Sequence, residues 1–143
     1  MKKFEYLDHM ADIKIRVNGA ALNEIFENSV LAFCNYVSGG EKISSTKGKI
    51  INVSGNDIES LLYNFMDELI YLLDAEHFLA CKAKITLMGN NLKAELYGDN
   101  ASNYNNLNQI KAATYHEMHV KKVKSRDNKN KEEHWEAQFI LDV

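Results

Sequence analysis

Hydrophobic and polar residues alternate over residues 12–18, where the apolar side chains occupy positions 13, 15 and 17. A period of two is typical of a strand with one buried face. From Ala21 the apolar spacing changes to three and four residues, which predicts an amphipathic helix that ends at Gly39 and Gly40. The apolar face of this helix is formed by Leu22, Ile25, Phe26, Val30, Phe33, Cys34 and Val37.

A second, longer helix is predicted over residues 56–73 by a continuous apolar stripe. We expect Asn56 to be its N-cap, with Glu59 three residues later as in a capping box. Burying one large apolar side chain contributes about 1.5–3 kcal/mol, so this helix should be the main source of core stability. The stripe consists of Ile58, Leu61, Leu62, Phe65, Met66, Leu69, Ile70 and Leu73.

Strands dominate the rest of the chain. Residues 83–87 and 92–97 flank a Gly-Asn-Asn turn and predict a β-hairpin, while residues 99–108 are polar and predict a loop. Two long helices followed mainly by strands predict an α+β fold, a two-layer sandwich with both helices packed on one face of a mostly antiparallel sheet. We expect one domain, residues 1–143, without linker or repeat. Further strands are predicted at residues 47–54, 110–116, 119–124 and 135–141.

The charge balance argues against a protein whose main task is to grip nucleic-acid phosphates. The net charge is −3 and the sequence pI is about 5.9, whereas such proteins are usually basic, at least on one face. Cys34 and Cys81 lie in apolar stretches without metal-ligand spacing and are expected to be buried free thiols. No apolar run reaches the roughly 18 residues of a membrane span, so a cytoplasmic protein is expected by elimination.

Asp8, His9 and Asp12 lie close together where a predicted loop meets a strand. Carboxylate oxygens suit Mg²⁺ and Ca²⁺, whereas a histidine ligand favours Mn²⁺ or Zn²⁺. Alone this is a weak signal, because exposed Asp and His residues are common where strands begin and an ordinary solvated loop accounts for the segment as well. Asp142 follows the apolar run at 139–141, and its carboxylate either is solvated at the chain end or faces Asp12 across the end of the sheet.

Lys111, Tyr115 and His116 form another polar group, on the strand predicted at residues 110–116. A period of two places Lys111 and Tyr115 on one face of that strand and His116 on the other. Such a row is either ordinary solvent-facing surface or a patch for a phosphate or a protein partner. No GxGxxG, Walker A, GxSxG or HExxH motif is present to indicate a nucleotide-binding loop, a serine nucleophile or a zinc site.

Five segments spread along the chain form a pattern that is more specific than any one of them. They are YLDHMAD at residues 6–12, LLYNFMDEL at 61–69, LKAELYGD at 92–99, IKAATYH at 110–116 and WEAQFILDV at 135–143. In this order, the segments resemble the archease family.

The resemblance implies a non-catalytic protein that acts with an RtcB-type RNA ligase. That ligase uses GTP and Mn²⁺ to join a 3′-phosphate or 2′,3′-cyclic phosphate end to a 5′-hydroxyl end. An archease promotes guanylylation of the ligase and allows multiple turnovers in tRNA splicing, so tRNA is met indirectly, through the ligase.

The resemblance also implies a site for a divalent metal ion, Ca²⁺, Mg²⁺ or Mn²⁺, held by acidic residues near both ends of the chain. The matching positions are Asp12 and Asp142, with His9 close by. We expect the two carboxylates about 3–6 Å apart, because ligand distances are about 2.0–2.6 Å. Lys111 matches a polar position linked to activity, and Tyr115 and His116 are expected to face the partner or a phosphate beside it.

Two positions depart from the family pattern. Met10 stands where the family usually has Thr, and Lys14 stands where it usually has Gly. A threonine hydroxyl that supports the metal loop would therefore be absent here. Two other functions remain open. One is a chaperone-like modulator of a tRNA cytosine methyltransferase, an older proposal for the family. The other is a metal-dependent phosphohydrolase using His9, Asp12, His116 and Asp142.

Overall fold

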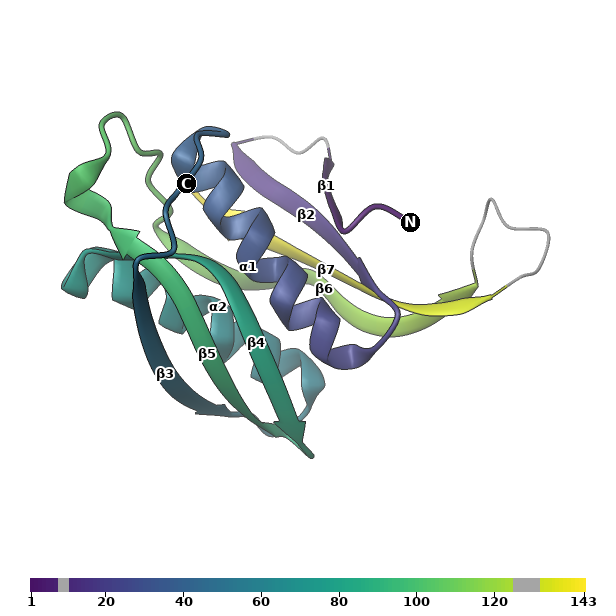
Figure 1. Ribbon diagram of the computed structural model, residues 1–143. Coiled ribbons are helices and arrows are strands. Elements are labelled where there is room, and N and C mark those ends of the chain that lie inside the picture. Colours follow the sequence, from purple (N-terminus) through teal and green to yellow (C-terminus); the bar gives the residue numbers. More distant parts are fainter. Residues whose placement is uncertain (8–10, 125–131) are drawn as a thin grey trace.

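The computed structural model describes residues 1–7, 11–124 and 132–143, and its strands form two antiparallel sheets (Figure 1). The four-stranded sheet has the order β1-β2-β7-β6, and the three-stranded sheet has the order β3-β5-β4. No described helix is both long and apolar enough to cross a membrane. The elements are β1 Phe4–Leu7, β2 Asp12–Gly19, α1 Leu22–Ser38, β3 Lys47–Ser54, α2 Ile58–Glu76, β4 Phe78–Met88, β5 Asn91–Asn100, a 3₁₀ turn Ala101–Asn103, β6 Ala112–Lys124 and β7 Glu133–Asp142.

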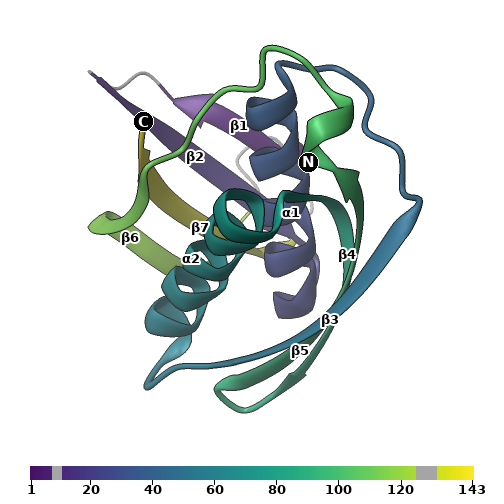
Figure 2. The ribbon, with the colours of Figure 1, turned by 90° about the vertical axis from the view of Figure 1, so that its left-hand side faces the viewer.

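Both helices lie between the two sheets (Figure 2). Helix α1 contacts β1, β2 and β7 on one side and β4 on the other, while α2 contacts β6 on one side and β3 and β4 on the other. The predicted α+β class, with both helices packed on an antiparallel sheet, is confirmed. The number of layers differs from the prediction, because β3, β4 and β5 form a second sheet that covers the other side of the helices. The fold therefore has a helical layer between two sheets.

Helix α1 is buried over a wider sector than its apolar stripe predicts, because sheets cover it on two sides. Even Ser29 is inaccessible to solvent, and its hydroxyl donates to the Ile25 carbonyl at 2.7 Å. The helix ends as predicted at Gly39, whose φ of +66° is the left-handed conformation that glycine adopts without strain.

The N-cap of α2 is Asp57, so the prediction of Asn56 with Glu59 was wrong by one residue. The Asp57 carboxylate accepts from the Ser60 N–H at 2.7 Å, and the Ser60 hydroxyl accepts from the Asp57 N–H at 3.0 Å. The same three-residue spacing thus exists one position later, with a carboxylate at the cap. A negative charge there is favoured by the positive end of the helix dipole.

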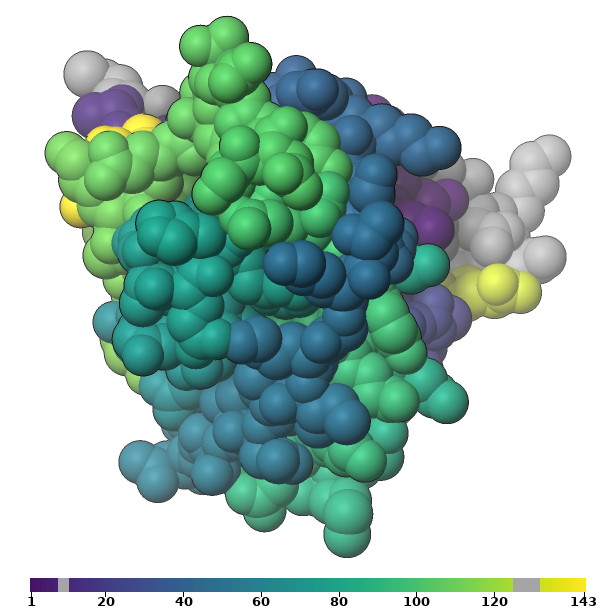
Figure 3. Space-filling view, turned by 60° about the vertical axis from the view of Figure 1, so that its left-hand side comes forward, coloured from purple at the N-terminus to yellow at the C-terminus, as the bar shows by residue number. Residues whose placement is uncertain are grey.

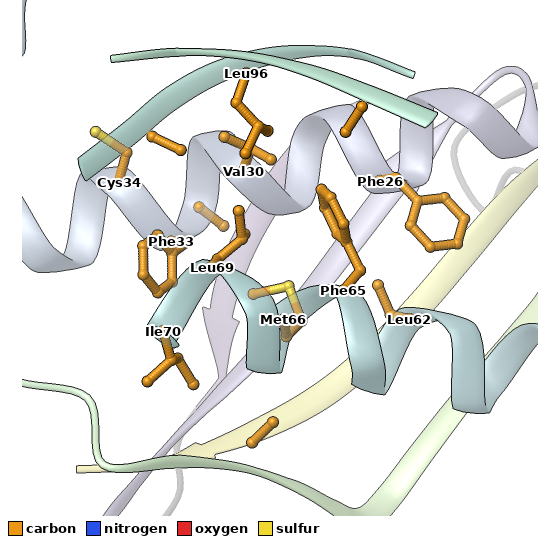
Figure 4. Packing of buried hydrophobic residues seen from close by; sticks show 14 of the residues in the cluster. Phe26, Val30, Phe33, Cys34, Leu62, Phe65, Met66, Leu69, Ile70 and Leu96 are labelled. Atoms are coloured by element: carbon orange, nitrogen blue, oxygen red, sulfur yellow. The ribbon is translucent and has the colours of Figure 1, made fainter. Parts of the chain in front are cut away.

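The core is formed by α1 and α2 together with the inner faces of both sheets, and Figure 4 shows the part where the two helices face each other. Phe26 of α1 and Phe65 of α2 are fully buried, and their rings meet edge to face at a centroid distance of 5.7 Å. Leu96 of β5 closes the cluster from the sheet side. The cysteines are free thiols as expected, although only Cys34 is buried and Cys81 is half-buried.

The segment after β5 is held down by one buried carboxylate. Asp99 accepts hydrogen bonds from the Tyr104 hydroxyl at 2.7 Å, the Asn100 N–H at 2.8 Å and the Thr46 hydroxyl at 3.0 Å. These donors hold the pKa of Asp99 below its usual range, with the Tyr104 hydroxyl as the largest cause. Residues 101–110 (green in Figure 3) consequently lie between α2 and the chain that follows α1.

The third departure from the predicted elements concerns β6. The two strands expected at residues 110–116 and 119–124 form one strand that is interrupted by a bulge. Thr114 pairs with Ile140 and His119 pairs with Gln138, so four residues of β6 stand opposite a single residue of β7. An insertion of this kind leaves no compositional mark that a sequence pattern can detect.

Candidate functional site

Asp12 and Asp142 are direct partners at one end of the four-stranded sheet. Strand β2 begins at Asp12, β7 ends at Asp142, and the antiparallel register places the two residues opposite each other (Figure 2). Side chains of directly opposed residues project from the same face, with Cβ atoms about 4.5–5.5 Å apart. The backbone therefore brings together two carboxylates that are 130 positions apart in the sequence.

The main chain fixes both residues. Ala11 has a φ of +67°, a left-handed conformation that costs a non-glycine residue about 1–2 kcal/mol, and it turns the chain into β2. Asp142 follows two buried residues of β7 and is paired on its other side with Ala112 of β6. Its carbonyl also accepts a hydrogen bond from the Lys111 N–H at 2.7 Å. Lys111 is exposed directly beside the carboxylate pair.

The donor set at this end of the sheet fits a hard divalent cation. Like charges directly opposite each other destabilise a sheet, and a bound cation removes that repulsion. Within the described residues, no three His, Cys, Asp or Glu side chains are grouped as metal ligands. His9, the third predicted ligand, lies outside the described residues. Asp12 and Asp142 could hold a cation whose remaining ligands are main-chain oxygens, water or groups of a partner, as is usual for Ca²⁺ and Mg²⁺.

Tyr115 and His116 lie in the β6 bulge rather than in a regular strand. Both are exposed, together with Glu117, whose φ of +53° is left-handed. Lys111 precedes the first residue of β6. The expected arrangement, with Lys111 and Tyr115 on one strand face and His116 on the other, is therefore wrong, because the bulge breaks the period of two.

A stacked pair of tyrosines joins the bulge to α2. The ring centroids of Tyr115 and Tyr63 lie 4.1 Å apart, and the angle between the ring planes is 5°. Tyr115 is 54% exposed. Partial burial raises the pKa of Tyr115, and the neighbouring Tyr63 and the Asp57 carboxylate add to that shift. Tyr63 was not singled out in the sequence, because a tyrosine within an apolar helix stripe gives no sign that it meets a distant strand.

An ion pair joins the bulge to β2. The Lys14 ammonium lies 3.5 Å from the Glu117 carboxylate, and the Glu117 carbonyl accepts from the Gln138 side-chain amide at 2.9 Å. Lys14 stands where the family usually has glycine, so this departure gives the bulge an additional contact. Met10, the other departure, lies outside the described residues.

Comparison with known proteins agrees with the fold and with the five segments. The archease protein family matches residues 4–143. "Protein archease" of Pyrococcus abyssi is 33% identical over 149 residues, covering 100% of both chains. The archease-like protein of Drosophila melanogaster is 34% identical over 124 residues, covering 82% of this chain and 80% of its own.

Two solved structures share the fold. The solution structure of protein 1598 from Methanobacterium thermoautotrophicum superposes with a TM-score of 0.75 at 25% identity and covers 100% of both chains. The crystal structure of an archease from Thermotoga maritima, described as a possible chaperone, superposes with a TM-score of 0.59 at 18% identity, covering 96% and 94% of the two chains. With a family match from Phe4 to the last residue, the chain belongs to the archease family.

Proposed function

We propose that this chain is a non-catalytic activator of an RtcB-type, GTP-dependent RNA ligase in tRNA splicing. In this proposal it promotes guanylylation of the ligase and multiple turnover, and it meets tRNA through the ligase. Membership of the archease family supports the general role. The observation that carries the specific proposal is the direct pairing of Asp12 with Asp142 at an end of the sheet where Lys111 is exposed.

Each residue has a separate task in this proposal. Asp12 and Asp142 hold a divalent cation between β2 and β7, with His9 as the third ligand that the family resemblance implies. When bound, the cation supplies positive charge next to nucleotide phosphates in the ligase. Lys111, whose main-chain N–H is hydrogen-bonded to the Asp142 carbonyl, supplies an ammonium for a phosphate or an acidic group of the partner. Tyr115 and His116 present an exposed aromatic ring and an imidazole to the ligase from the β6 bulge.

The test is a ligation assay with the cognate ligase in substoichiometric amount, GTP and Mn²⁺. The wild-type protein should convert a single-turnover reaction into a multiple-turnover one. Asp12→Asn and Asp142→Asn should abolish that effect, whereas Asp74→Asn, which changes an exposed acid on α2, should leave it intact. Circular dichroism establishes that each variant is folded. A folded Asp12→Asn protein that activates fully would refute the metal-holding role.

A second candidate is a chaperone-like modulator of a tRNA cytosine methyltransferase. The observation in its favour is that the Thermotoga maritima relative is described as a possible chaperone. Light scattering of the methyltransferase during mild heating, with and without this protein, tests the idea. Suppressed aggregation without any change in ligase turnover would support this role over the first, and no change in scattering would exclude it.

A further inference from the structure

The three-stranded sheet has one face turned away from the helices (Figure 2). On its central strand β5, Leu92, Ala94 and Leu96 are buried and point inward, so the intervening residues point outward. The register extends this outer face across both neighbouring strands. It consists of Gly48, Ile50, Asn52 and Ser54 on β3, of Tyr97, Glu95, Lys93 and Asn91 on β5, and of Lys82, Lys84, Thr86 and Met88 on β4.

This outer face is basic although the protein is acidic. Its only carboxylate is Glu95, against Lys82, Lys84 and Lys93, whereas the whole chain carries a net charge of −3. Within the described residues, none of these three lysines forms an ion pair with a carboxylate. Helix α2, in contrast, carries five acidic residues and neither lysine nor arginine. The charges are therefore segregated, and the outer face is complementary to a polyanion.

Tyr97 lies at one end of this face and is half-buried. Tyr97 of β5 stands opposite Gly48 of the neighbouring strand β3. A Cβ placed on that glycine would lie 3.9 Å from the nearest ring atoms of Tyr97. Any larger residue at position 48 would extend its side chain along the ring. On the other side, the Lys82 ammonium lies 5.6 Å from the ring centroid. An aromatic ring with a cation on one side and a glycine on the other is the kind of platform on which a nucleobase stacks.

Apart from Tyr97, the face offers two exposed apolar side chains, and it has a hollow at the end opposite Tyr97. Met88, in the row farthest from Tyr97, is 75% exposed, and Ile50, opposite Glu95 in the row next to Tyr97, is 60% exposed. A hollow of about 230 Å³ lies next to Met88, between the ends of β3, β4 and β5. That volume is below the roughly 300–1,000 Å³ of small-molecule pockets, so the hollow suits part of a chain better than a whole cofactor.

We propose that the outer face of the β3-β5-β4 sheet binds single-stranded nucleic acid. One base stacks on Tyr97, and Lys82, Lys84 and Lys93 contact successive phosphates across the strands. Ile50 and Met88 pack against sugars or bases further along. Single strands suit this surface because their bases are free to lie flat on an open sheet, whereas the bases of a duplex are already stacked. The inference does not depend on the metal site or on the ligase.

The test measures fluorescence anisotropy of a labelled 12-nucleotide single-stranded RNA, titrated with the isolated protein in EDTA at 50 mM salt. Replacing Lys82, Lys84 and Lys93 by Gln should weaken binding at least tenfold. It should also reduce the slope of log affinity against log salt by about 2, because each contacted phosphate of a single strand contributes about 0.7. The matched control replaces three lysines of β6 by Gln, with the same change in net charge and little expected effect: Lys121, Lys122 and Lys124.

A second comparison separates stacking from general electrostatic attraction. Tyr97→Leu should weaken binding by at least about fivefold, the lower bound for one stacked base, whereas Tyr97→Phe should retain it. Chemical shift changes on adding the RNA should map to β3, β4 and β5. Equal losses in the sheet and β6 triple variants, or no measurable binding by the wild type at 50 mM salt, would overturn the proposal. Because the assay contains neither divalent cation nor ligase, its failure would leave the proposed ligase function untouched.

Discussion

Asp142→Asn should have two effects on the stability of the protein. It should raise stability when no divalent cation is present, because it removes the repulsion between the opposed carboxylates of Asp12 and Asp142, and it should weaken the stabilisation that a divalent cation gives. Two unit charges about 5 Å apart repel by about 0.8 kcal/mol at the dielectric constant of water. That value suits Asp142 because it is exposed, and it lies within the roughly 0.2–1 kcal/mol of cross-strand pairs. In EDTA, Asp142→Asn should therefore raise the free energy of unfolding by about 0.5–1 kcal/mol.

The corresponding shift in melting temperature is measurable by differential scanning calorimetry. For 143 residues, an unfolding entropy of about 2.1 cal/mol/K per residue makes 1 kcal/mol equal to about 3 °C. The variant should thus melt about 2–3 °C above the wild type in EDTA. A cation at about 100 times its Kd should stabilise the wild type by about 2.7 kcal/mol, or about 8–9 °C, and the variant far less.

The two effects have opposite signs, which makes the prediction easy to refute. Ca²⁺, Mg²⁺ and Mn²⁺ are titrated separately, and Asp74→Asn serves as the control because it removes an exposed acid on another element, α2. That control should respond to cations like the wild type. If Asp142→Asn gains as much stability from a cation as the wild type does, or if no cation stabilises the wild type, the carboxylate pair is not the metal site.

Three further outcomes follow from the structure. Phe65→Ala should lower the free energy of unfolding by about 3–5 kcal/mol in chemical denaturation, because it leaves a cavity and removes the edge-to-face contact with Phe26; a loss below about 1 kcal/mol would contradict the packing. Because the folded-state pKa of Asp99 is lowered, its stabilising contribution is present above the unfolded pKa and is lost as the pH falls through the folded pKa. Asp99→Asn should therefore flatten the acid limb of the stability curve below about pH 4, and an unchanged limb would exclude this role. Burial raises the pKa of Cys34 to about 12, so a thiol reagent at pH 8 should label the half-buried Cys81 first. Rapid labelling of Cys34 in a folded Cys81→Ser protein would show that Cys34 is not buried.

Local sequence patterns predicted the elements that depend on neighbouring residues. The strand at residues 47–54 was predicted with the same bounds as β3, and the hairpin turns at Gly89 with a φ of +60°. The end of α1 at Gly39 followed from the same argument. These features depend on alternation, helical period and positive φ, which a chain expresses over a few residues.

The candidate site was found in part. A resemblance to a family pointed to Asp12 and Asp142, whereas the residues alone left open whether Asp142 was a solvated chain end. Their direct pairing depends on the β2–β7 register, which joins two strands at opposite ends of the sequence. The contacts of Tyr115 and Lys14 were not predictable, because both depend on a bulge in β6.

By itself, the sequence determined the α+β class, most helix and strand positions and the family, because these are expressed in local periodicity and in motifs along the chain. Only the tertiary structure decided that strands β3, β4 and β5 leave the main sheet and cover the helices from the other side. It also decided that Lys82, Lys84 and Lys93 share one sheet face with Tyr97 in a protein of net charge −3. The physical reason is the same in both cases. A period of two shows that one strand face is buried, but it carries no information about which strand pairs with which, and non-local pairing determines which side chains share a surface.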